Sequence, residues 1–362
     1  MSNDILDIAA RFRISSSPVS FNECTEGHIN GTYFVTAEKG DRYVLQKINT
    51  SIFRNPAGLM DNVIGVTEHI RRKLIAEGGD ADRGTLRFLR TTDGKSYYTD
   101  TDGSAWREYV YVGGVESYQS AGSPEVFRSV GGAFGHFQMQ LADYDAASLC
   151  ETIPNFHNTP SRYADFEAAL ARNASGRAEN AADAIEFAKA HREVCSYITD
   201  RIADGTLPLR VTHNDTKLNN ILIDKATGKP ICVIDLDTVM PGSVLFDFGD
   251  AIRFGASSAA EDERDLSRVF MREEMFDAFA GGFIGGLEGS LGDAEINELP
   301  MGALVITLET GLRFLADYLD GDTYFRIHFP EQNLDRARNQ FKLVADMEEK
   351  MPLMCNIIKK YL

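Results

Sequence analysis

The sequence has few cysteines and comparatively few basic residues. Its five cysteines among 362 residues are scattered and never form a CxxC pair, so neither a disulfide framework nor a zinc site is expected. Lys and Arg number 37 against 54 Asp and Glu, which gives a formal net charge of -17. Because an acidic surface repels nucleic-acid phosphates and anionic lipid, we expect neither nucleic acid nor membrane as a partner.

Long hydrophobic runs are also lacking. The opening segment, MSNDILDIAARFRI, contains acids and no apolar core of signal-peptide length. The longest uncharged apolar run, residues 301–308, is far shorter than a membrane span. No repeat or low-complexity tract indicates a solenoid or a propeller. We therefore expect a soluble, cytoplasmic protein that is a monomer or a weak homodimer.

The first third of the chain is rich in strand signals. Residues 31–36 and 43–48 are β-rich and flank a turn at 39–41, and Asp-Gly pairs at 93–94 and 102–103 mark further hairpins. Between these two sets lies a single helix-period segment. Its apolar face is formed by Val63, Val66, Ile70 and Leu74.

Beyond residue 112 the character of the sequence changes. Gly113-Gly114 is a plausible hinge, and Ser123 and Pro124 fit the N-cap and first turn of a helix. The remainder is mostly helical. We predict an α+β fold of two lobes, a β-rich N-terminal lobe over 1–112 and a larger helical lobe over 113–362. Three strand-like pieces interrupt the helical part, at 209–212, 221–223 and 231–234.

Polar residues between these pieces carry the candidate chemistry. The segment VTHNDTKLNNILID places Asp215 five residues before Asn220, and Asp235 follows Asp215 by twenty. Phosphoryl transfer needs a carboxylate that orients and deprotonates the attacking hydroxyl, together with oxygen ligands that hold Mg²⁺ against the phosphates. Asp215 would be the base, and Asn220 and Asp235 the Mg²⁺ ligands. Any one of these residues in a loop is more often a turn former, but the combined spacing favours function.

The same residues resemble a known superfamily. HNDTKLNN followed by VIDLD is similar to the aminoglycoside phosphotransferase and choline kinase superfamily, which has a protein-kinase-like fold. GHINGTYFVT, RYVLQKINTSIF, LFDFGDAIRFGAS and GLRFLADYLDGDTYF extend the likeness to N-acetylhexosamine 1-kinases, over residues 27–325. This resemblance implies ATP-dependent, Mg²⁺-dependent phosphorylation of the anomeric hydroxyl of N-acetylglucosamine or N-acetylgalactosamine.

The resemblance also assigns roles within the loop. It carries the base onto Asp215, and His213 resembles a histidine that braces the loop in its neutral form. Lys217 matches a position that contacts phosphate, although a solvated loop lysine fits equally well. Asp237 supports the metal site or caps a turn. Asp247 begins a DFG triplet but lies 32 residues after Asp215, so we expect it to brace the loop rather than bind metal.

Nucleotide contacts are expected in the N-terminal lobe. A glycine-rich turn lets backbone N–H groups approach phosphates. Gln46 occupies the strand position where kinases carry a phosphate-binding lysine, with Lys47 on the opposite side of the strand. In kinases the strand lysine pairs with a glutamate on the following helix. Glu68 would be that glutamate here, but we expect it to lie on a solvated helix face. The predicted ATP contacts are Gly27, Asn30, Gly31, Thr32, Gln46 and, at the adenine, Tyr109 and Tyr111.

The resemblance places the sugar against Arg313 and Tyr324, with His28 also within reach. Glu309 lies four residues before Arg313, so a simple ion pair on the helix surface is the structural alternative. A kinase for another small alcohol, such as an aminoglycoside, choline or homoserine, fits the same loop. VIDLDTVM also matches the nucleophile motif of haloacid-dehalogenase-like phosphatases, with Asp235 attacking phosphate.

Overall fold

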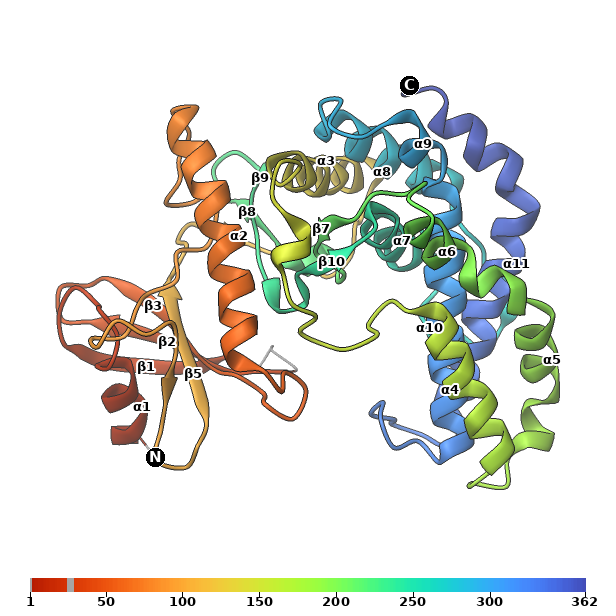
Figure 1. Ribbon diagram of the computed structural model, residues 1–362, viewed down its shortest axis with the longest axis horizontal. Helices are drawn as coiled ribbons and strands as arrows, with labels where there is room; N and C mark the ends of the chain where they lie inside the picture. Colours follow the sequence, from red (N-terminus) through yellow and green to blue (C-terminus); the bar gives the residue numbers. More distant parts are fainter. Residues whose placement is uncertain (1, 25–28) are drawn as a thin grey trace. The chain divides into compact units, whose positions relative to one another are not determined.

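The computed structural model describes residues 2–24 and 29–362, and Gly27 and His28 therefore lie outside the described residues. The chain forms two compact units, each assembled from separate stretches of sequence (Figure 1). The first unit comprises Met1–Ser117, Asp143–Pro154 and Ile221–Pro241. The second comprises Tyr118–Ala142, Asn155–Asn220 and Gly242–Leu362.

The first unit is built on a five-stranded antiparallel sheet. Its strands lie in the order β1-β2-β3-β5-β4, and a smaller antiparallel sheet has the order β6-β8-β9. The elements of this unit are α1 (Ser2–Ala9), β1 (Pro18–Cys24), β2 (Gly31–Ala37), β3 (Arg42–Lys47), α2 (Pro56–Ala76), β4 (Tyr98–Thr99), β5 (Ala105–Val110), β6 (Val115–Glu116), β8 (Ile221–Asp224) and β9 (Pro230–Val233).

Alternation of side chains separates the two faces of the five-stranded sheet. Tyr43, Leu45 and Trp106 point to one face, where they form an apolar core with residues of α1. Successive residues of a strand point to opposite faces, so Gln46 and Arg107, which pair across β3 and β5, lie on the other face. The apolar core thus fixes which polar side chains are presented on the opposite side.

One carboxylate departs from this pattern. Glu108 is on the apolar face, opposite Leu45, and its residue is 0% exposed. Neither oxygen of its side chain has a hydrogen-bond partner among the described residues. Burial raises the pKa of Glu108 to about 8, because removal from water disfavours the charged form. Glu108 is therefore a buried carboxylic acid within an otherwise apolar core.

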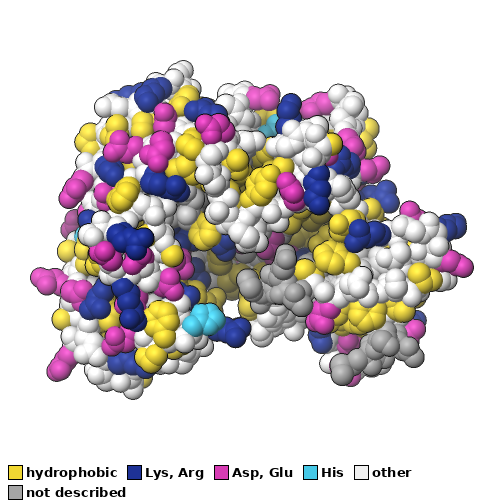
Figure 2. Space-filling model, turned by 180° about the vertical axis from the view of Figure 1, so that it is seen from behind, with side chains coloured by type: hydrophobic (Ala, Val, Ile, Leu, Met, Phe, Trp, Pro, Cys, Tyr) yellow, Lys and Arg dark blue, Asp and Glu magenta, His cyan; other side chains and the backbone are white. Residues whose placement is uncertain are grey.

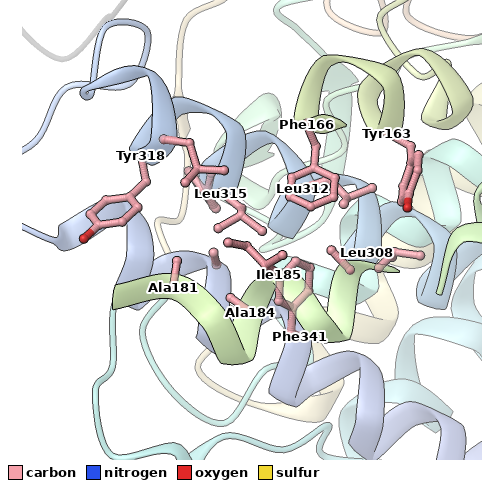
Figure 3. Packing of buried hydrophobic residues seen from close by; sticks show 14 of the residues in the cluster. Tyr163, Phe166, Ala181, Ala184, Ile185, Leu308, Leu312, Leu315, Tyr318 and Phe341 are labelled. Carbon is pink, nitrogen blue, oxygen red and sulfur yellow. The ribbon is translucent and has the colours of Figure 1, made fainter. Parts of the chain in front are cut away.

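The second unit is mostly helical, and α10 lies at its centre, packed against α4, α7 and α11. Aromatic and aliphatic side chains from α4, α5, α10 and α11 form its core, including Phe166, Ile185, Leu312 and Phe341 (Figure 3). Its elements are α3 (Pro124–Gln140), α4 (Thr159–Arg172), α5 (Ala182–Ala190), α6 (Tyr197–Ala203), β7 (Arg210–Thr212), α7 (Val244–Gly255), α8 (Glu273–Gly286), α9 (Asp293–Asn297), α10 (Leu299–Asp320) and α11 (Gln332–Ile358). Strand β10 (Met240–Gly242) spans the return of the chain to this unit.

Glycines bring α3 and α8 into close contact. A Cβ atom on Gly135 would lie 2.1 Å from the carbonyl oxygen of Phe283, and one on Gly282 would lie 1.9 Å from the carbonyl oxygen of Arg128. No real Cβ contact is that short, so only glycine permits this helix spacing. α8 in turn supports α7, which positions part of the candidate site.

The expectations for individual elements are largely confirmed. The helix predicted from Ser123 and Pro124 is α3, and the side chain of Ser123 caps it by accepting from the Val126 N–H. The three strand-like pieces form β7, β8 and β9, and the Asp102-Gly103 turn joins β4 to β5. The Asp93-Gly94 turn also forms, but an isolated bridge at Thr91 stands in place of a hairpin.

Within the described part of the chain, α10 has the length and composition of a membrane span. In that stretch 78% of the residues are buried by the rest of the protein, so its apolar character is accounted for by its central position in the second unit. Acidic and basic side chains are interspersed over the face shown in Figure 2.

Candidate active site

The loop between β7 and β8 contains the predicted base, Asp215, and the side chain of Asp247 binds the backbone of this loop. The Asp247 carboxylate accepts hydrogen bonds from the backbone N–H of His213 at 2.9 Å and of Asn214 at 2.7 Å. Gln138 of α3 donates to it as well, at 2.6 Å. Asn214 has a φ of 65°, in the left-handed region that is unfavourable for most residues. The buried carboxylate thus stabilises a sharp turn that presents Asp215.

The electrostatic state of Asp247 follows from its burial. Loss of solvent raises its pKa above the usual range, and the two backbone N–H groups and Gln138 partly oppose this rise by stabilising the carboxylate. Both oxygens are occupied by donors within the protein. Asp247 therefore acts as a brace for the loop, as its distance from Asp215 in the sequence predicted.

His213 is fully buried between two aromatic side chains. Its ring contacts Phe134 and Phe137 edge-on, with centroids 5.7 and 6.0 Å away. Nδ1 accepts a hydrogen bond from the backbone N–H of Asp215 at 3.3 Å. His213 is thus held between helix α3 and the loop, and its role as a neutral brace stays a prediction.

Asp215, Lys217 and Asn220 form one half-buried cluster in the second unit. The ammonium of Lys217 lies 2.5 Å from Oδ1 of Asp215. The amide nitrogen of Asn220 donates to the backbone oxygen of Asp215 at 2.8 Å and to its Oδ2 at 3.1 Å. The oxygen of the Asn220 amide accepts no hydrogen bond from the residues that the structure describes. It is therefore available as a hard ligand for a cation.

Next to this cluster, within the same unit, lie further charged side chains of alternating sign. Burial opposes the charge of Lys217, but Asp215 and then Asp250 raise its pKa above the usual value. Burial likewise opposes the charge of Asp250, while Arg253 and then Lys217 hold its pKa low. Arg253 contacts Asp250 at 2.9 Å and Glu261 at 2.8 Å. Lys217, whose side chain is 36% exposed, thus pairs with Asp215, and the Asp250–Arg253 pair near it is buried.

The predicted metal ligand Asp235 belongs to the first unit. It lies two residues beyond the end of β9 and has a φ of 59°, in the left-handed region. Among the described residues no group of three or more His, Cys, Asp and Glu side chains is arranged to hold a metal ion. Mg²⁺ in phosphoryl transfer needs only one or two protein oxygens besides phosphate and water. The residue types at Asp235 and Asn220 fit this requirement, and their pairing around one ion stays a prediction.

Asp237, whose role the sequence left open, is the acceptor of a buried network in the first unit. Arg107 of β5 forms an ion pair with Oδ1 of Asp237, and both side chains are 4% exposed. Asn30 donates to Oδ2 at 2.7 Å, and the hydroxyl of Thr152 donates to the Asp237 backbone oxygen at 2.8 Å. The side chain of Asp237 is thus fully engaged within the protein, and Arg107 is a residue that sequence reasoning missed.

Three of the predicted nucleotide residues belong to this network. Gln46 donates to the hydroxyl of Thr32 at 3.1 Å and accepts from Nε of Arg107 at 2.9 Å. Asn30 accepts from the backbone N–H of Asn49 at 2.9 Å, so its side chain links the turn before β2 to the residues after β3. Gly31 begins β2.

The other β3 expectations are also resolved. Lys47 points away from Gln46, and its ammonium lies 5.7 Å from the centroid of Trp106 on the apolar face. Glu68 is exposed on α2. The first unit therefore has no lysine–glutamate pair built from these two positions.

The predicted adenine contacts lie at the end of β5, with Tyr109 inside the strand and Tyr111 just beyond it. The N–H groups of Val110 and Tyr111 already donate to the backbone oxygens of Arg87 and Arg42, at 3.0 and 3.1 Å. The next residue, Val112, donates no backbone hydrogen bond within the described residues. Adenine recognition through a backbone N–H would thus fall to Val112, one residue beyond Tyr111.

The second unit places Arg313 among aromatic rings. Its guanidinium lies 5.7 Å from the ring of Phe156, 6.0 Å from that of Tyr324 and 5.5 Å from that of Phe325. No hydrogen bond or ion pair joins this guanidinium to another described residue. Tyr324 is 67% exposed. Arg313 and Tyr324 are thus neighbours, as a shared ligand site requires.

The helix ion pair between Glu309 and Arg313, the alternative to a ligand contact, is not formed among the described residues. Glu309 is buried, and it accepts from the hydroxyl of Thr159 at 2.6 Å and contacts Nδ1 of His157 at 2.8 Å. Burial works against the charged pair, but Glu309 raises the pKa of His157. Nε2 of His157 lies 3.2 Å from the backbone oxygen of Asn214. His157 therefore connects α10 to the loop that contains Asp215. The guanidinium of Arg313 is not paired with Glu309 and is available to a ligand.

A cavity of about 350 Å³ also lies in the second unit. Leu218 and Arg253 line it, together with Gln340, whose buried Oε1 has no hydrogen-bond partner in the described part of the chain. Arg313 and Tyr324 are not among its lining residues. The cavity wall therefore adjoins the charge network of Asp215 rather than the aromatic cluster.

Comparison with known proteins identifies the class. Residues 20–277, well over half of the chain, match the phosphotransferase enzyme family (APH). The chain therefore belongs to this family of small-molecule phosphotransferases. Together with the antiparallel sheets of the first unit, this membership excludes the alternative of a haloacid-dehalogenase-like phosphatase.

Solved structures share the fold at low sequence identity. A microcompartment-associated aminopropanol kinase is 16% identical with a TM-score of 0.57, covering 97% of this chain and 98% of its own. A choline/ethanolamine kinase family protein from Mesorhizobium loti is 16% identical with a TM-score of 0.55, covering 99% and 100%. Amicoumacin kinase hAmiN, in complex with AMP-PNP and Ca²⁺, is 14% identical with a TM-score of 0.56, covering 96% and 93%. The predicted kinase-like α+β fold is confirmed.

Proposed function

We propose that this phosphotransferase transfers the γ-phosphoryl group of ATP to the C1 hydroxyl of an N-acetylhexosamine, with Asp215 as the base. The observation that carries the proposal is the catalytic loop. Asp247 fixes its backbone, and Lys217 and Asn220 hold the Asp215 carboxylate. A carboxylate oriented in this way can accept a proton at Oδ from an approaching hydroxyl. The proposed location is the cytoplasm.

The residues present fit ATP and a divalent cation. When bound, ATP supplies the phosphoryl group and Mg²⁺ offsets its negative charge. Asn220 and Asp235 stay the predicted Mg²⁺ ligands, and the free amide oxygen of Asn220 supports this role. The ammonium of Lys217 pairs with the half-buried carboxylate of Asp215 and offsets its charge before substrate binds.

Arg313 and Tyr324 are the proposed contacts for the sugar. A hexosamine acceptor offers hydroxyl and acetamido oxygens to a guanidinium and apolar ring faces to aromatic side chains. Arg313 has unused donors and three aromatic neighbours, which suits such a ligand. Because Arg313 places a positive charge within the aromatic cluster, it disfavours a cationic acceptor.

The second candidate is a kinase for another small alcohol. The loop around Asp215 recognises the reacting hydroxyl and not the rest of the acceptor, so choline, an aminoglycoside or homoserine satisfies the same geometry. The charge of Arg313 argues against choline and aminoglycosides, since both are cations. Homoserine, with its carboxylate, is the strongest of these alternatives.

Release of ADP across an acceptor panel tests the proposal. Purified protein with ATP and Mg²⁺ is supplied in turn with N-acetylglucosamine, N-acetylgalactosamine, an aminoglycoside, choline and homoserine. We expect acceptor-dependent ADP with the two N-acetylhexosamines. ADP formed only with one of the other three acceptors would establish the second candidate instead. An Asp215→Asn variant, assayed in parallel, identifies any contaminating ATPase.

A further inference from the structure

The buried arginine of β5 has no role in the function described so far. Kinases place on strand β3 a lysine that binds nucleotide phosphates. This chain has Gln46 there, and Lys47 points to the opposite face, against Trp106. Arg107 is the direct cross-strand neighbour of Gln46 and is on the same face. The sheet therefore presents a buried cation within a few ångströms of the position where the lysine is missing.

The guanidinium of Arg107 is only partly engaged. Nε donates to Gln46 at 2.9 Å, and Nη1 pairs with Asp237. The second terminal nitrogen, Nη2, donates to no side chain or backbone oxygen among the described residues. Arg has five N–H donors in a planar fork that matches phosphate oxygens. Nε and Nη1 are thus held by protein groups, and Nη2 is available to a ligand.

The surroundings of Arg107 link it to the residues expected at the phosphates. Asp237 also binds Asn30 in the turn before β2, and Gln46 also binds Thr32 at the start of β2. Burial opposes the charge of Arg107, but Asp237 first, with a smaller contribution from Asp235, raises its pKa above the usual value. The predicted phosphate-binding residues Asn30, Thr32 and Gln46 are therefore linked to one guanidinium.

We propose that Arg107 binds the phosphates of ATP in place of the β3 lysine, with Gln46 and Asp237 holding its guanidinium in position. The proposal rests on the proposed use of ATP. It differs from a purely structural reading, in which Arg107 and Asp237 form an ion pair that only stabilises the sheet. In the structural reading, loss of Arg107 weakens the fold without distinguishing one nucleotide from another.

Direct binding of nucleotides separates the two readings without any acceptor. Calorimetric titrations of ATP, ADP and adenosine are made with the wild-type protein and with Arg107→Met. A charge-assisted hydrogen bond contributes roughly 1.5–3 kcal/mol, or about a 10- to 100-fold change in affinity. We expect ADP and ATP to bind at least about tenfold more weakly to Arg107→Met, with unchanged affinity for adenosine.

Three further variants guard against misfolding and non-specific effects. Arg107→Met alone leaves Asp237 buried and unpaired, so the double variant Arg107→Met/Asp237→Asn removes both charges together. Gln46→Lys/Arg107→Met returns a lysine to β3 and should restore part of the ADP affinity. Arg87→Met, an exposed arginine of the same unit, is the matched control and should bind ADP as the wild type does.

The proposal would be overturned if Arg107→Met and Arg107→Met/Asp237→Asn bound ADP as tightly as the wild type does. It would also be overturned if these variants lost affinity for ADP and for adenosine in parallel. These outcomes leave the proposed function intact, because the wild type still binds ATP. A wild type that binds neither ATP nor ADP would contradict the proposed function and the role of Arg107 together.

Discussion

The carboxylate of Asp247 accepts a 2.9 Å hydrogen bond from the backbone N–H of His213, two residues before the proposed base. This contact joins helix α7 to the loop that contains the proposed base. It also distinguishes Asp247 from Asp235, since either could be taken for the metal ligand from the sequence. Asp247 holds the loop in place, whereas Asp235 belongs to the other unit. The two residues should therefore fail in different ways when they are changed.

Asp247→Ala should destabilise the protein, whereas Asp235→Ala should abolish Mg²⁺-dependent activity with little change in melting temperature. Each backbone N–H left without an acceptor costs about 1–3 kcal/mol. Thermal melts and Mg²⁺ titrations of both variants measure this, with the exposed Asp165→Ala as a control. A stable Asp247→Ala protein that has lost its metal dependence would reverse the two roles.

Asp215→Asn should keep the fold and bind nucleotide normally while turnover falls roughly 10²- to 10⁴-fold, the usual contribution of a general base. The amide retains the shape of the side chain and its hydrogen bond to Asn220 but cannot accept the proton. Steady-state rates and ADP titrations measure the two effects. Turnover above about a tenth of the wild-type value would remove Asp215 from the role of base.

Arg313→Met should raise the KM for the acceptor about tenfold or more and leave the KM for ATP unchanged, because a guanidinium donates charge-assisted hydrogen bonds that methionine cannot replace. Arg192→Met is the matched control. Arg192 also lies over an aromatic ring of the same unit, that of Tyr163, but it is an exposed residue away from Arg313 and Tyr324. Equal changes in both KM values would place Arg313 in the support of the fold rather than at the acceptor.

Glu108→Gln should change how stability depends on pH. The pKa of Glu108 is raised to about 8 from an ordinary value of 4.5. Between these values the unfolded chain releases a proton that the folded protein retains, so wild-type stability declines as pH rises from 4.5 to about 8. The variant lacks this contribution. Its stability relative to wild type should increase by up to about 1.4 kcal/mol per pH unit in this range.

Denaturant unfolding of wild type and Glu108→Gln at several pH values measures this difference. The exposed Glu38→Gln of the same unit should show none. A difference between Glu108→Gln and wild type that does not vary from pH 4.5 to 8 would show that Glu108 is ionised in the folded protein.

The loop over residues 213–220 and the strands beside it were predictable because their signal is local. His213, Asp215 and Asn220 lie within eight residues, and the short strands on either side have plain apolar patterns. The helix from Ser123 was predictable for the same reason, since its cap and first turn are contiguous. Helix α1 was not recognised, because its eight residues span little more than two turns, and strand β1 was also missed.

Contacts between distant positions could not be predicted. Arg107 meets Gln46 through pairing of β3 with β5, and nothing in either segment alone specifies that register. The missing lysine at Gln46 was the signal that a replacement should be sought. Glu309 could be paired with Arg313 by helix spacing, but tertiary packing brings His157 to it from 152 residues away.

The position of the phosphate on the product tests the central proposal most directly. Nuclear magnetic resonance of the product from N-acetylglucosamine should place the phosphate on C1. The methyl glycoside of N-acetylglucosamine keeps the ring contacts but lacks the reacting hydroxyl, so it should compete with the sugar and never be phosphorylated. Phosphate on that glycoside, at C6 for example, would contradict the proposed reaction at the anomeric hydroxyl.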